Sequence, residues 1–179
     1  LTFYLPDTDQ LFMSSLGYKK ARKIIEKILY ITIATSSKGG APWNSPVYSA
    51  FDEDYNFFWA SWKENQHSKN IRENNQVFIV IYDATVPEGT GEGVYIQAKA
   101  YELDNEREIK HALSYLDGRV SKKKDPKTRV AEFQGNKPRR VYKAVPEKVW
   151  INGEGDISGD YIDIRMEVKL KNEFRGKNI

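Results

Sequence analysis

The segment from Tyr55 to Asp83 constrains the fold more than any other part of the chain, because a short polar stretch joins two apolar runs. Its sequence is YNFFWASWKENQHSKNIRENNQVFIVIYD. This pattern predicts a strand over Asn56–Ser61, then a short polar helix, and then a strand over Gln76–Asp83 that is covered on both faces. Ser68 and Lys69 lie where the helix begins, and the backbone N–H groups at a helix start favour an anion such as phosphate.

The composition limits the chemistry available to this chain. It has 179 residues, no cysteine and two histidines, His67 and His111, which excludes thiol chemistry and argues against a conventional zinc site. No stretch approaches the roughly 18 consecutive apolar residues of a membrane span, and the first residues lack the pattern of a signal peptide. We therefore expect one cytoplasmic domain over residues 1–179, with 1–13 and 171–179 as terminal extensions.

Positive charge is concentrated in two runs, Arg119–Arg129 and Lys169–Lys177, while the formal net charge is only +3. Such runs are usually solvated surfaces. Aromatic residues do not alternate with the first run, as they do in proteins that bind single-stranded nucleic acid by stacking. A function in nucleic-acid binding, through this basic run on a barrel, is therefore the least favoured one.

The first half of the chain predicts one helix followed by three strands. Apolar residues at helical spacing indicate an amphipathic helix over Ser14–Leu29, with Ser14 or Ser15 as its N-terminal cap. The runs Tyr30–Ser36 and Pro42–Phe51 are rich in β-branched and aromatic residues and are separated by the turn sequence SKGGA, which predicts a hairpin. With Asn56–Ser61 they form three antiparallel strands in meander order.

The second half predicts three more strands and two helices. In Val94–Leu103, residues Val94, Ile96, Ala98 and Ala100 share one face of a strand. A helix is expected over Asn105–Asp117 with Asp104 as its cap, and a short helix near Val130–Phe133. Two further strands are expected, Arg139–Ile151 with an interruption at Pro146, and Tyr161–Leu170 with alternate residues facing inward. Six or seven antiparallel strands with helices at the corners predict a small closed or partly closed barrel in one α+β domain.

Candidate ligand contacts cluster around the polar turn after Ser61. Lys69 could neutralise a phosphate while Ser68 donates a hydrogen bond, although a solvated lysine beside a capping serine is the commoner meaning of such a pair. Trp43, Trp59 and Trp62 could form aromatic walls for a flat conjugated ligand or belong to the core, with Trp59 the best candidate for the core. The sequence Asn44-Ser45-Pro46-Val47 offers amide and carbonyl groups to a heterocycle.

Other motifs carry less information. The loop PEGTGEG lacks the Gly-Lys-Ser/Thr ending of a P-loop and is expected to be mobile. Ser121 to Lys124 matches the S-x-x-K pattern of a nucleophilic serine, but it lies in a lysine-rich loop without the partner motifs. His67 is a candidate proton donor beside a ligand, although an exposed or cap-like histidine is the commoner interpretation of such a residue. No carboxylate pair or Ser/His/Asp set stands out.

Three sequence blocks in this order resemble the FMN-binding split-barrel family related to pyridoxamine 5′-phosphate oxidase: GGAPWNSPVYSAFDEDYNFFWAS, NQHSKNIRENNQVFIVIYD and GVYIQAKAYEL. The resemblance covers roughly Ala21 to Asn152. It implies a six-stranded split barrel that is active as a homodimer, with FMN bound in two clefts at the subunit interface.

The resemblance also implies which residues contact the cofactor. Asn44, Ser45, Pro46 and Val47 would line the isoalloxazine ring. The ring and the ribityl chain would run along Trp59, Ala60 and Ser61. Ser68 and Lys69 would hold the phosphate next to His67, and weaker candidates on the partner chain's side are Glu92, Gly93 and Trp150.

The chain departs from the family where true pyridoxamine phosphate oxidases hold their substrate. Trp150 is followed by Ile151, Asn152 and Gly153, and no histidine occurs after His111. The general-stress and flavin reductase-like branches therefore fit better than vitamin B6 oxidation. We expect an FMN-dependent oxidoreductase that exchanges hydride with a small molecule, and the alternative is a module that binds FMN, a deazaflavin or haem without turnover.

Overall fold

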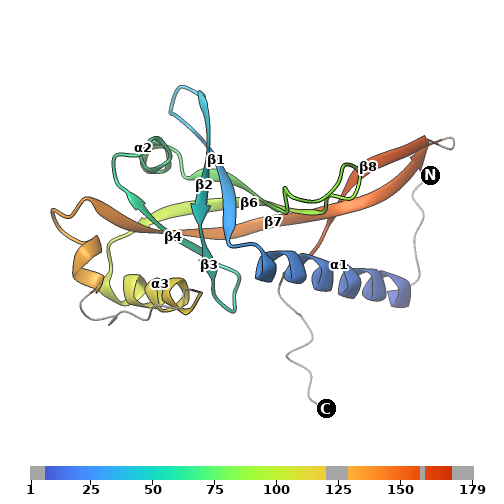
Figure 1. Ribbon diagram of the computed structural model, residues 1–179, viewed down its shortest axis with the longest axis horizontal. Helices are drawn as coiled ribbons and strands as arrows, with labels where there is room; N and C mark the ends of the chain where they lie inside the picture. Colours follow the sequence, from blue (N-terminus) through green and yellow to red (C-terminus); the bar gives the residue numbers. More distant parts are fainter. Residues whose placement is uncertain (1–6, 120–128, 158–159, 171–179) are drawn as a thin grey trace, which may run out of the picture.

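The sheet closes on itself because one stretch of chain changes partners along its length. The computed structural model describes residues 7–119, 129–157 and 160–170. β1 (Tyr30–Ser36) pairs with β2 (Pro42–Tyr48), and the chain continues directly into β3 (Ala50–Phe51), which pairs with β4 (Phe57–Trp62). The strand order is β2-β1-β5-β6-β7-β4-β3, so only Ser49 separates the two ends of this path in sequence. The strands thus form an antiparallel barrel, as predicted (Figure 1).

All seven predicted strands occur, and the sheet has eight because one of them divides. The predicted strand Pro42–Phe51 breaks at Ser49, whose buried backbone N–H donates to the carbonyl of Leu29 at 3.0 Å instead of extending a ladder. The remaining strands are β5 (Gln76–Tyr82), β6 (Gly93–Leu103), β7 (Arg139–Ile157) and β8 (Asp160–Glu167).

β5 differs from the prediction in how it is covered. Its residues alternate between buried and accessible, and Phe78 and Tyr82 are 39% and 48% exposed. The expectation of a strand covered on both faces was wrong, because a continuous apolar run does not distinguish a second buried layer from an apolar outer surface. By contrast, the inward face predicted for β6 is confirmed, since Val94, Ile96, Ala98 and Ala100 are all fully buried.

β7 is longer and more regular than predicted. It runs without a break from Arg139 to Ile157, and Pro146 causes a bulge rather than an interruption: the register with β6 shifts between Gln97 and Ala98. The end of β7 forms a hairpin with β8 that projects to one side of the barrel (Figure 1). β8 ends at Glu167, so Val168 and Leu170 are buried as expected but lie beyond the end of β8, whereas the predicted strand continued to Leu170.

The helices agree with the predictions in position but not at their starts. α1 (Asp7–Lys27) begins before Ser14, so neither Ser14 nor Ser15 is its cap. A serine inside a helix lowers helix stability by only about 0.5 kcal/mol relative to alanine, so the helix can continue through both residues. α2 is Gln66–Glu73, α3 is Glu106–Gly118, and η1 is the short 3-10 helix Ala131–Phe133. Within the described ranges, no helix combines the length and apolar character needed to cross a membrane.

α3 is capped by Asn105 and not by Asp104. The Asn105 side-chain oxygen accepts hydrogen bonds from the backbone N–H groups of Arg107 and Glu108 at 2.9 and 3.3 Å. Both residue types favour the cap position, and sequence alone could not decide which of two neighbours would occupy it.

α1 lies along the barrel and the β7–β8 hairpin (Figure 1). Its Ala21 and Ile25 are buried in the barrel core. Gly17 lies so close to the hairpin that a Cβ atom there would be 2.6 Å from Cγ1 of Val168. At the other end of α1, the Arg119 guanidinium donates to the carbonyls of Ile25, Glu26 and Ile28 and to that of Ser49.

Candidate functional site

α2 brings together the ends of two strands that pair with different neighbours. The imidazole of His67 lies between β2 and β4, with Nδ1 3.1 Å from Oγ of Ser45 and Nε2 2.9 Å from Oγ of Ser61. All three residues were predicted as cofactor contacts from separate parts of the sequence. The structure therefore places three of the predicted residues in one cluster, which we call the serine–histidine cluster.

His67 is a buried and neutral member of this cluster. It is only 5% exposed, and burial lowers the pKa of its imidazole. Both ring nitrogens already have a hydroxyl partner. His67 is thus neither the exposed histidine of the simpler interpretation nor a free ligand for a metal.

Ser68 and Lys69 point to different environments. Ser68 is fully buried and its hydroxyl donates to the backbone carbonyl of Trp62 at 2.9 Å, which ties α2 to the end of β4. The Lys69 side chain is about half exposed, and its ammonium group lies 3.8 Å from a carboxylate oxygen of Glu64. In this arrangement Lys69 can meet an anion from solvent, while Ser68 holds the helix that carries it.

The three tryptophans also divide between surface and core. Trp43 and Trp62 are 49% and 51% exposed and flank the serine–histidine cluster in sequence on β2 and β4. The Trp43 indole Nε1 donates to Oγ of Ser45 at 2.9 Å. Trp59 is fully buried and stacks on Tyr142 with ring centroids 5.5 Å apart, which confirms its predicted place in the core.

The other predicted contacts on β2 and β4 are distributed over both faces of the sheet. Asn44 and Pro46 are exposed and alternate with Ser45, whereas Val47 is buried in the barrel core. Ala60 is half-buried and packs against a hydrophobic cluster outside the barrel core, which includes Phe58 of β4 and Leu113 of α3. Of the four residues Asn44 to Val47, only Ser45 bonds to the cluster through its side chain.

Two residues that the sequence analysis missed support the cluster. Asn65 donates from Nδ2 to Oγ of Ser61 at 2.9 Å, and the buried Asn70 donates to the hydroxyl of Thr35 on β1 at 3.0 Å. Their signal in the sequence is weak, because asparagine is common in polar turns and short helices. Asn70 lies on the inward face of α2 next to Ile71, and this position could have indicated a buried hydrogen bond.

The candidates assigned to the partner chain lie away from the cluster. Glu92 forms an ion pair with Lys20 at 2.8 Å, and Gly93 is buried at the start of β6. Trp150 packs on the outer face against Phe78, with ring centroids 6.3 Å apart. Within the described part of the chain none of the three contacts the serine–histidine cluster, so a joint site would require a second copy.

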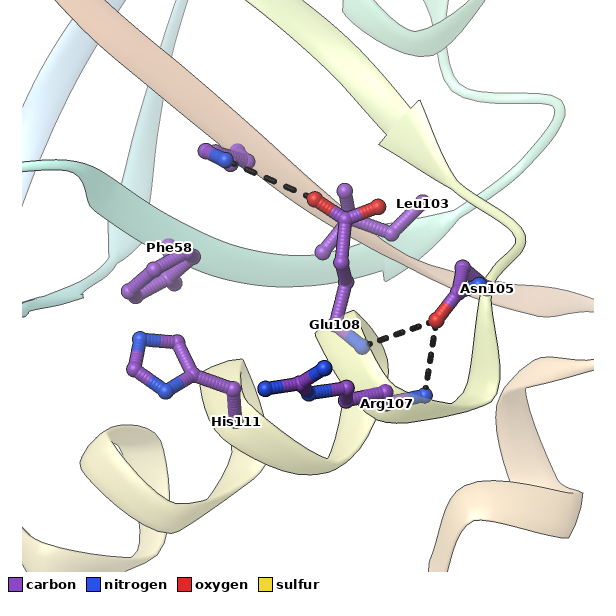
Figure 2. Close-up of a pocket in the computed structure, with 7 residues that line it drawn as sticks. Phe58, Leu103, Asn105, Arg107, Glu108 and His111 are labelled. Atoms are coloured by element: carbon purple, nitrogen blue, oxygen red, sulfur yellow. Dashed lines mark hydrogen bonds and ion pairs between the residues drawn. The ribbon is translucent and has the colours of Figure 1, made fainter.

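A separate cavity of about 400 Å³ lies between α3 and the sheet (Figure 2). Phe58 and Leu103 supply apolar walls, and His111 meets the Phe58 ring edge to face at 5.7 Å. His111 Nε2 lies 3.3 Å from a carboxylate oxygen of Asp52. Lys143 crosses to Glu108 at 3.5 Å, and Asn105 caps α3 at the rim. This cavity was not predicted from the sequence.

Three sequence features fall wholly or partly beyond the described ranges. The S-x-x-K match over Ser121 to Lys124 lies outside them, as does most of the basic run Arg119–Arg129. The end of the tail Lys169–Lys177 lies outside them too. The PEGTGEG loop is described and connects β5 to β6.

Comparison with known proteins bears on this geometry. Residues 18–153 match the family profile of pyridoxamine 5′-phosphate oxidase. They include β1 to β6, α2, α3 and most of β7, but not β8. No curated protein matches the sequence.

Solved structures share the fold at low sequence identity. The haem storage protein HutZ from Vibrio cholerae is 15% identical with a TM-score of 0.61, covering 73% of this chain and 91% of its own. An FAD-binding protein from Mesorhizobium loti is 16% identical with a TM-score of 0.54, covering 74% of this chain and 91% of its own. A haem-binding protein from Mycobacterium smegmatis is 15% identical with a TM-score of 0.60, covering 83% of this chain and 57% of its own.

Proposed function

Because the chain belongs to the pyridoxamine 5′-phosphate oxidase family, we propose that it is an FMN-binding oxidoreductase that transfers hydride or electrons between the flavin and a small molecule. The observation that carries this proposal is the serine–histidine cluster. Ser45 and Ser61 are half-buried, and the exposed indole of Trp43 donates to Oγ of Ser45 at 2.9 Å. This combination of polar donors and aromatic surface suits a conjugated heterocycle.

The roles of the residues follow from their positions. Bound FMN would supply the redox chemistry, and the chain would bind and orient it. Lys69 offers an exposed positive charge for the phosphate at the start of α2, Ser45 and Ser61 offer hydroxyl groups, and Trp43 offers a ring face. The structure of the FAD-binding protein from Mesorhizobium loti supports a flavin, since it has the same fold.

A homodimer is part of this proposal. Phe78 and Tyr82 expose aromatic surface on the outer face of β5, and Trp150 lies beside Phe78. Exposed apolar surface of this kind usually marks an interaction site. A second copy placed over it would cover these rings and could contribute Trp150 to the flavin cleft.

The substrate is proposed to differ from pyridoxamine phosphate. Asn152 and Gly153 lie on β7 beyond Trp150, and both are used within the sheet. Asn152 Oδ1 accepts from the Gly93 N–H of β6 at 2.7 Å, and its Nδ2 donates to Asp163 of β8 at 3.1 Å. A Cβ atom on Gly153 would lie 2.5 Å from Cγ of Met166. These positions therefore serve hairpin packing and offer no cationic group to a phosphorylated substrate.

Flavin binding tests the proposal directly. The purified protein should absorb as a flavoprotein or quench FMN fluorescence on titration, and a reductant should bleach the flavin absorption. Lys69→Glu should weaken FMN binding at least about tenfold, because it reverses the charge next to the phosphate. The matched control is Lys19→Glu, the same charge change at an exposed position of α1. If both variants bind like the parent protein, Lys69 does not hold the phosphate; if no flavin binds at all, the proposal is wrong.

A second candidate is a module that binds haem, FMN or a deazaflavin without turnover. The cavity between α3 and the sheet favours haem. His111 has a carboxylate partner on Nε2, and no described residue bonds to its Nδ1. Histidine ligands of metals commonly carry such a carboxylate on the other ring nitrogen. The structural neighbours that bind or store haem support this candidate. A haem titration separates the two: His111→Ala should abolish a Soret shift if His111 ligates the iron, whereas flavin binding should remain.

A further inference from the structure

Five side chains form a continuous line of four hydrogen bonds through the serine–histidine cluster. Trp43 Nε1 donates to Ser45 Oγ, and Ser45 Oγ contacts His67 Nδ1 at 3.1 Å. On the other side, His67 Nε2 contacts Ser61 Oγ at 2.9 Å, and Asn65 Nδ2 donates to the same oxygen. Both ends of the line are groups that can only donate: an indole N–H and an amide NH₂.

The line contains one more proton than it has bonds. Trp43, Ser45, neutral His67, Ser61 and the Asn65 amide each bring one donor proton to the line, which makes five protons for four bonds. His67 is neutral because it is buried, and no described residue carries another hydrogen bond to either serine hydroxyl. One hydroxyl proton must therefore point out of the line.

The tautomer of His67 decides which serine carries that proton. With the proton on Nε2, His67 donates to Ser61, and Ser45 donates to Nδ1, which leaves the Ser61 hydroxyl proton free. With the proton on Nδ1, His67 donates to Ser45 and accepts from Ser61, which leaves the Ser45 proton free. The excess proton exists in either case, and only its position changes.

We infer that the serine–histidine cluster presents one hydroxyl donor to a hydrogen-bond acceptor on the bound ligand, and that the tautomer of His67 places this donor on Ser45 or on Ser61. The inference rests on the proposed function, because it assigns the cluster to the same flavin site. Both serines are half-buried, so either hydroxyl can reach a ligand at the surface. His67 acts as a positioning residue here and does not itself touch the ligand.

The chemistry of the ligand follows from the excess donor. A group that only donates would leave the hydroxyl proton unpaired, whereas a carbonyl oxygen, an unprotonated ring nitrogen or a phosphate oxygen would accept it. Oxidised FMN carries all three kinds of acceptor. A ligand that accepts from one serine necessarily stabilises one tautomer of His67, so the imidazole reports on binding without touching the ligand.

Asn65→Asp provides a sharp test, because it replaces the terminal donor with a carboxylate that can only accept. The line then has four protons for four bonds, since Asn65 no longer supplies one. Ser61 donates to Asp, His67 donates from Nε2 to Ser61, and Ser45 donates to Nδ1. The variant should hold His67 in the Nε2-protonated tautomer, and aspartate remains a good residue for the first position before α2.

The experiment is ¹⁵N NMR of the two histidines in labelled protein at pH 8, where the buried His67, whose pKa is lowered, is neutral. His111→Asn identifies the His67 signals. The nitrogen shifts report the populations of the two neutral tautomers, first without ligand and then with saturating FMN. Gln66→Glu is the control, because it adds the same charge on the next residue, whose amide bonds to Asn70 and not to the line.

The inference is supported if FMN moves His67 toward one tautomer, if Asn65→Asp holds the Nε2-protonated form, and if Gln66→Glu leaves the mixture unchanged. Alanine at the serine that donates to FMN should weaken binding about fivefold to tenfold, as expected for one neutral hydrogen bond. If FMN binds but the tautomer populations stay the same, the inference is overturned and the proposed function stands. If FMN does not bind, the proposed function fails. The response of the His67 tautomers to Asn65→Asp in the ligand-free protein still tests whether the line holds five protons for four hydrogen bonds.

Discussion

Nε2 of His67 lies 2.9 Å from Oγ of Ser61, so a residue of α2 fixes the end of β4. Because the other nitrogen of the same imidazole contacts Ser45 on β2, one buried side chain joins two strands that do not pair with each other along the sheet path. This is the place where the barrel closes, and it coincides with the candidate site.

The buried imidazole should make stability depend on pH. Burial lowers the pKa of His67 below the value of about 6.5 in the unfolded chain, so the unfolded state binds more protons as the pH falls through 6.5. The free energy of unfolding should therefore decrease between about pH 7.5 and pH 5.5. His67→Gln removes this contribution, so its melting temperature should fall less over the same interval. Equal pH dependence of the two proteins would contradict the assignment of a neutral, buried His67.

The cap of α3 can be tested by comparing two neighbouring residues. Asn105→Ala should lower the free energy of unfolding by about 1 kcal/mol, because the N–H groups of Arg107 and Glu108 lose their acceptor. Asp104→Ala should change it by less than about 0.5 kcal/mol, since Asp104 is exposed and does not cap the helix. Urea denaturation of both variants measures the difference, and a larger effect at Asp104 would argue for the cap expected from the sequence.

The contact between α1 and the hairpin predicts a coupling between Gly17 and Val168. Gly17→Ala should gain about 1 kcal/mol of helix propensity, but its methyl group would collide with Cγ1 of Val168. Val168→Ala removes that atom. In a double-mutant cycle, the double variant should therefore be more stable than the sum of the single changes predicts, by at least about 0.5 kcal/mol. Additive effects would mean that α1 does not rest on the hairpin as described.

Arg119 should contribute to stability mainly through hydrogen bonds to main-chain carbonyls. Its guanidinium donates to the last carbonyls of α1 and to Ser49, and it lies 5.1 Å from the centre of the Phe51 ring. Arg119→Met keeps much of the apolar stem but leaves those carbonyls without their donor, so it should cost about 2 kcal/mol. Arg119→Lys should recover only part of this, because an ammonium group cannot reproduce the planar fork. Thermal unfolding of both variants tests the prediction, and full recovery by lysine would contradict it.

Local patterns predicted much of the fold because each strand shows its inward face in its own residues. The alternation in β6 and the burial of Trp59 on β4 were both correct. The errors occurred where neighbours compete for one role or where tertiary contacts decide. Asp104 and Asn105 have similar cap preferences, Ser49 breaks its strand only because Leu29 is close, and β5 has an apolar outer face that resembles a second buried one.

The candidate site divides in the same way. The sequence by itself determined that Ser45, Ser61 and His67 belong to a family pattern, and alternation along β2 separates Ser45 from Asn44 and Pro46. Only the tertiary structure decided that these three residues touch, that Ser68 faces inward while Lys69 faces solvent, and that Asn65 completes the line of hydrogen bonds. The physical reason is that periodicity assigns a residue to a face of its own strand or helix, whereas the partners across that face depend on how the closed sheet aligns segments that lie far apart in the chain.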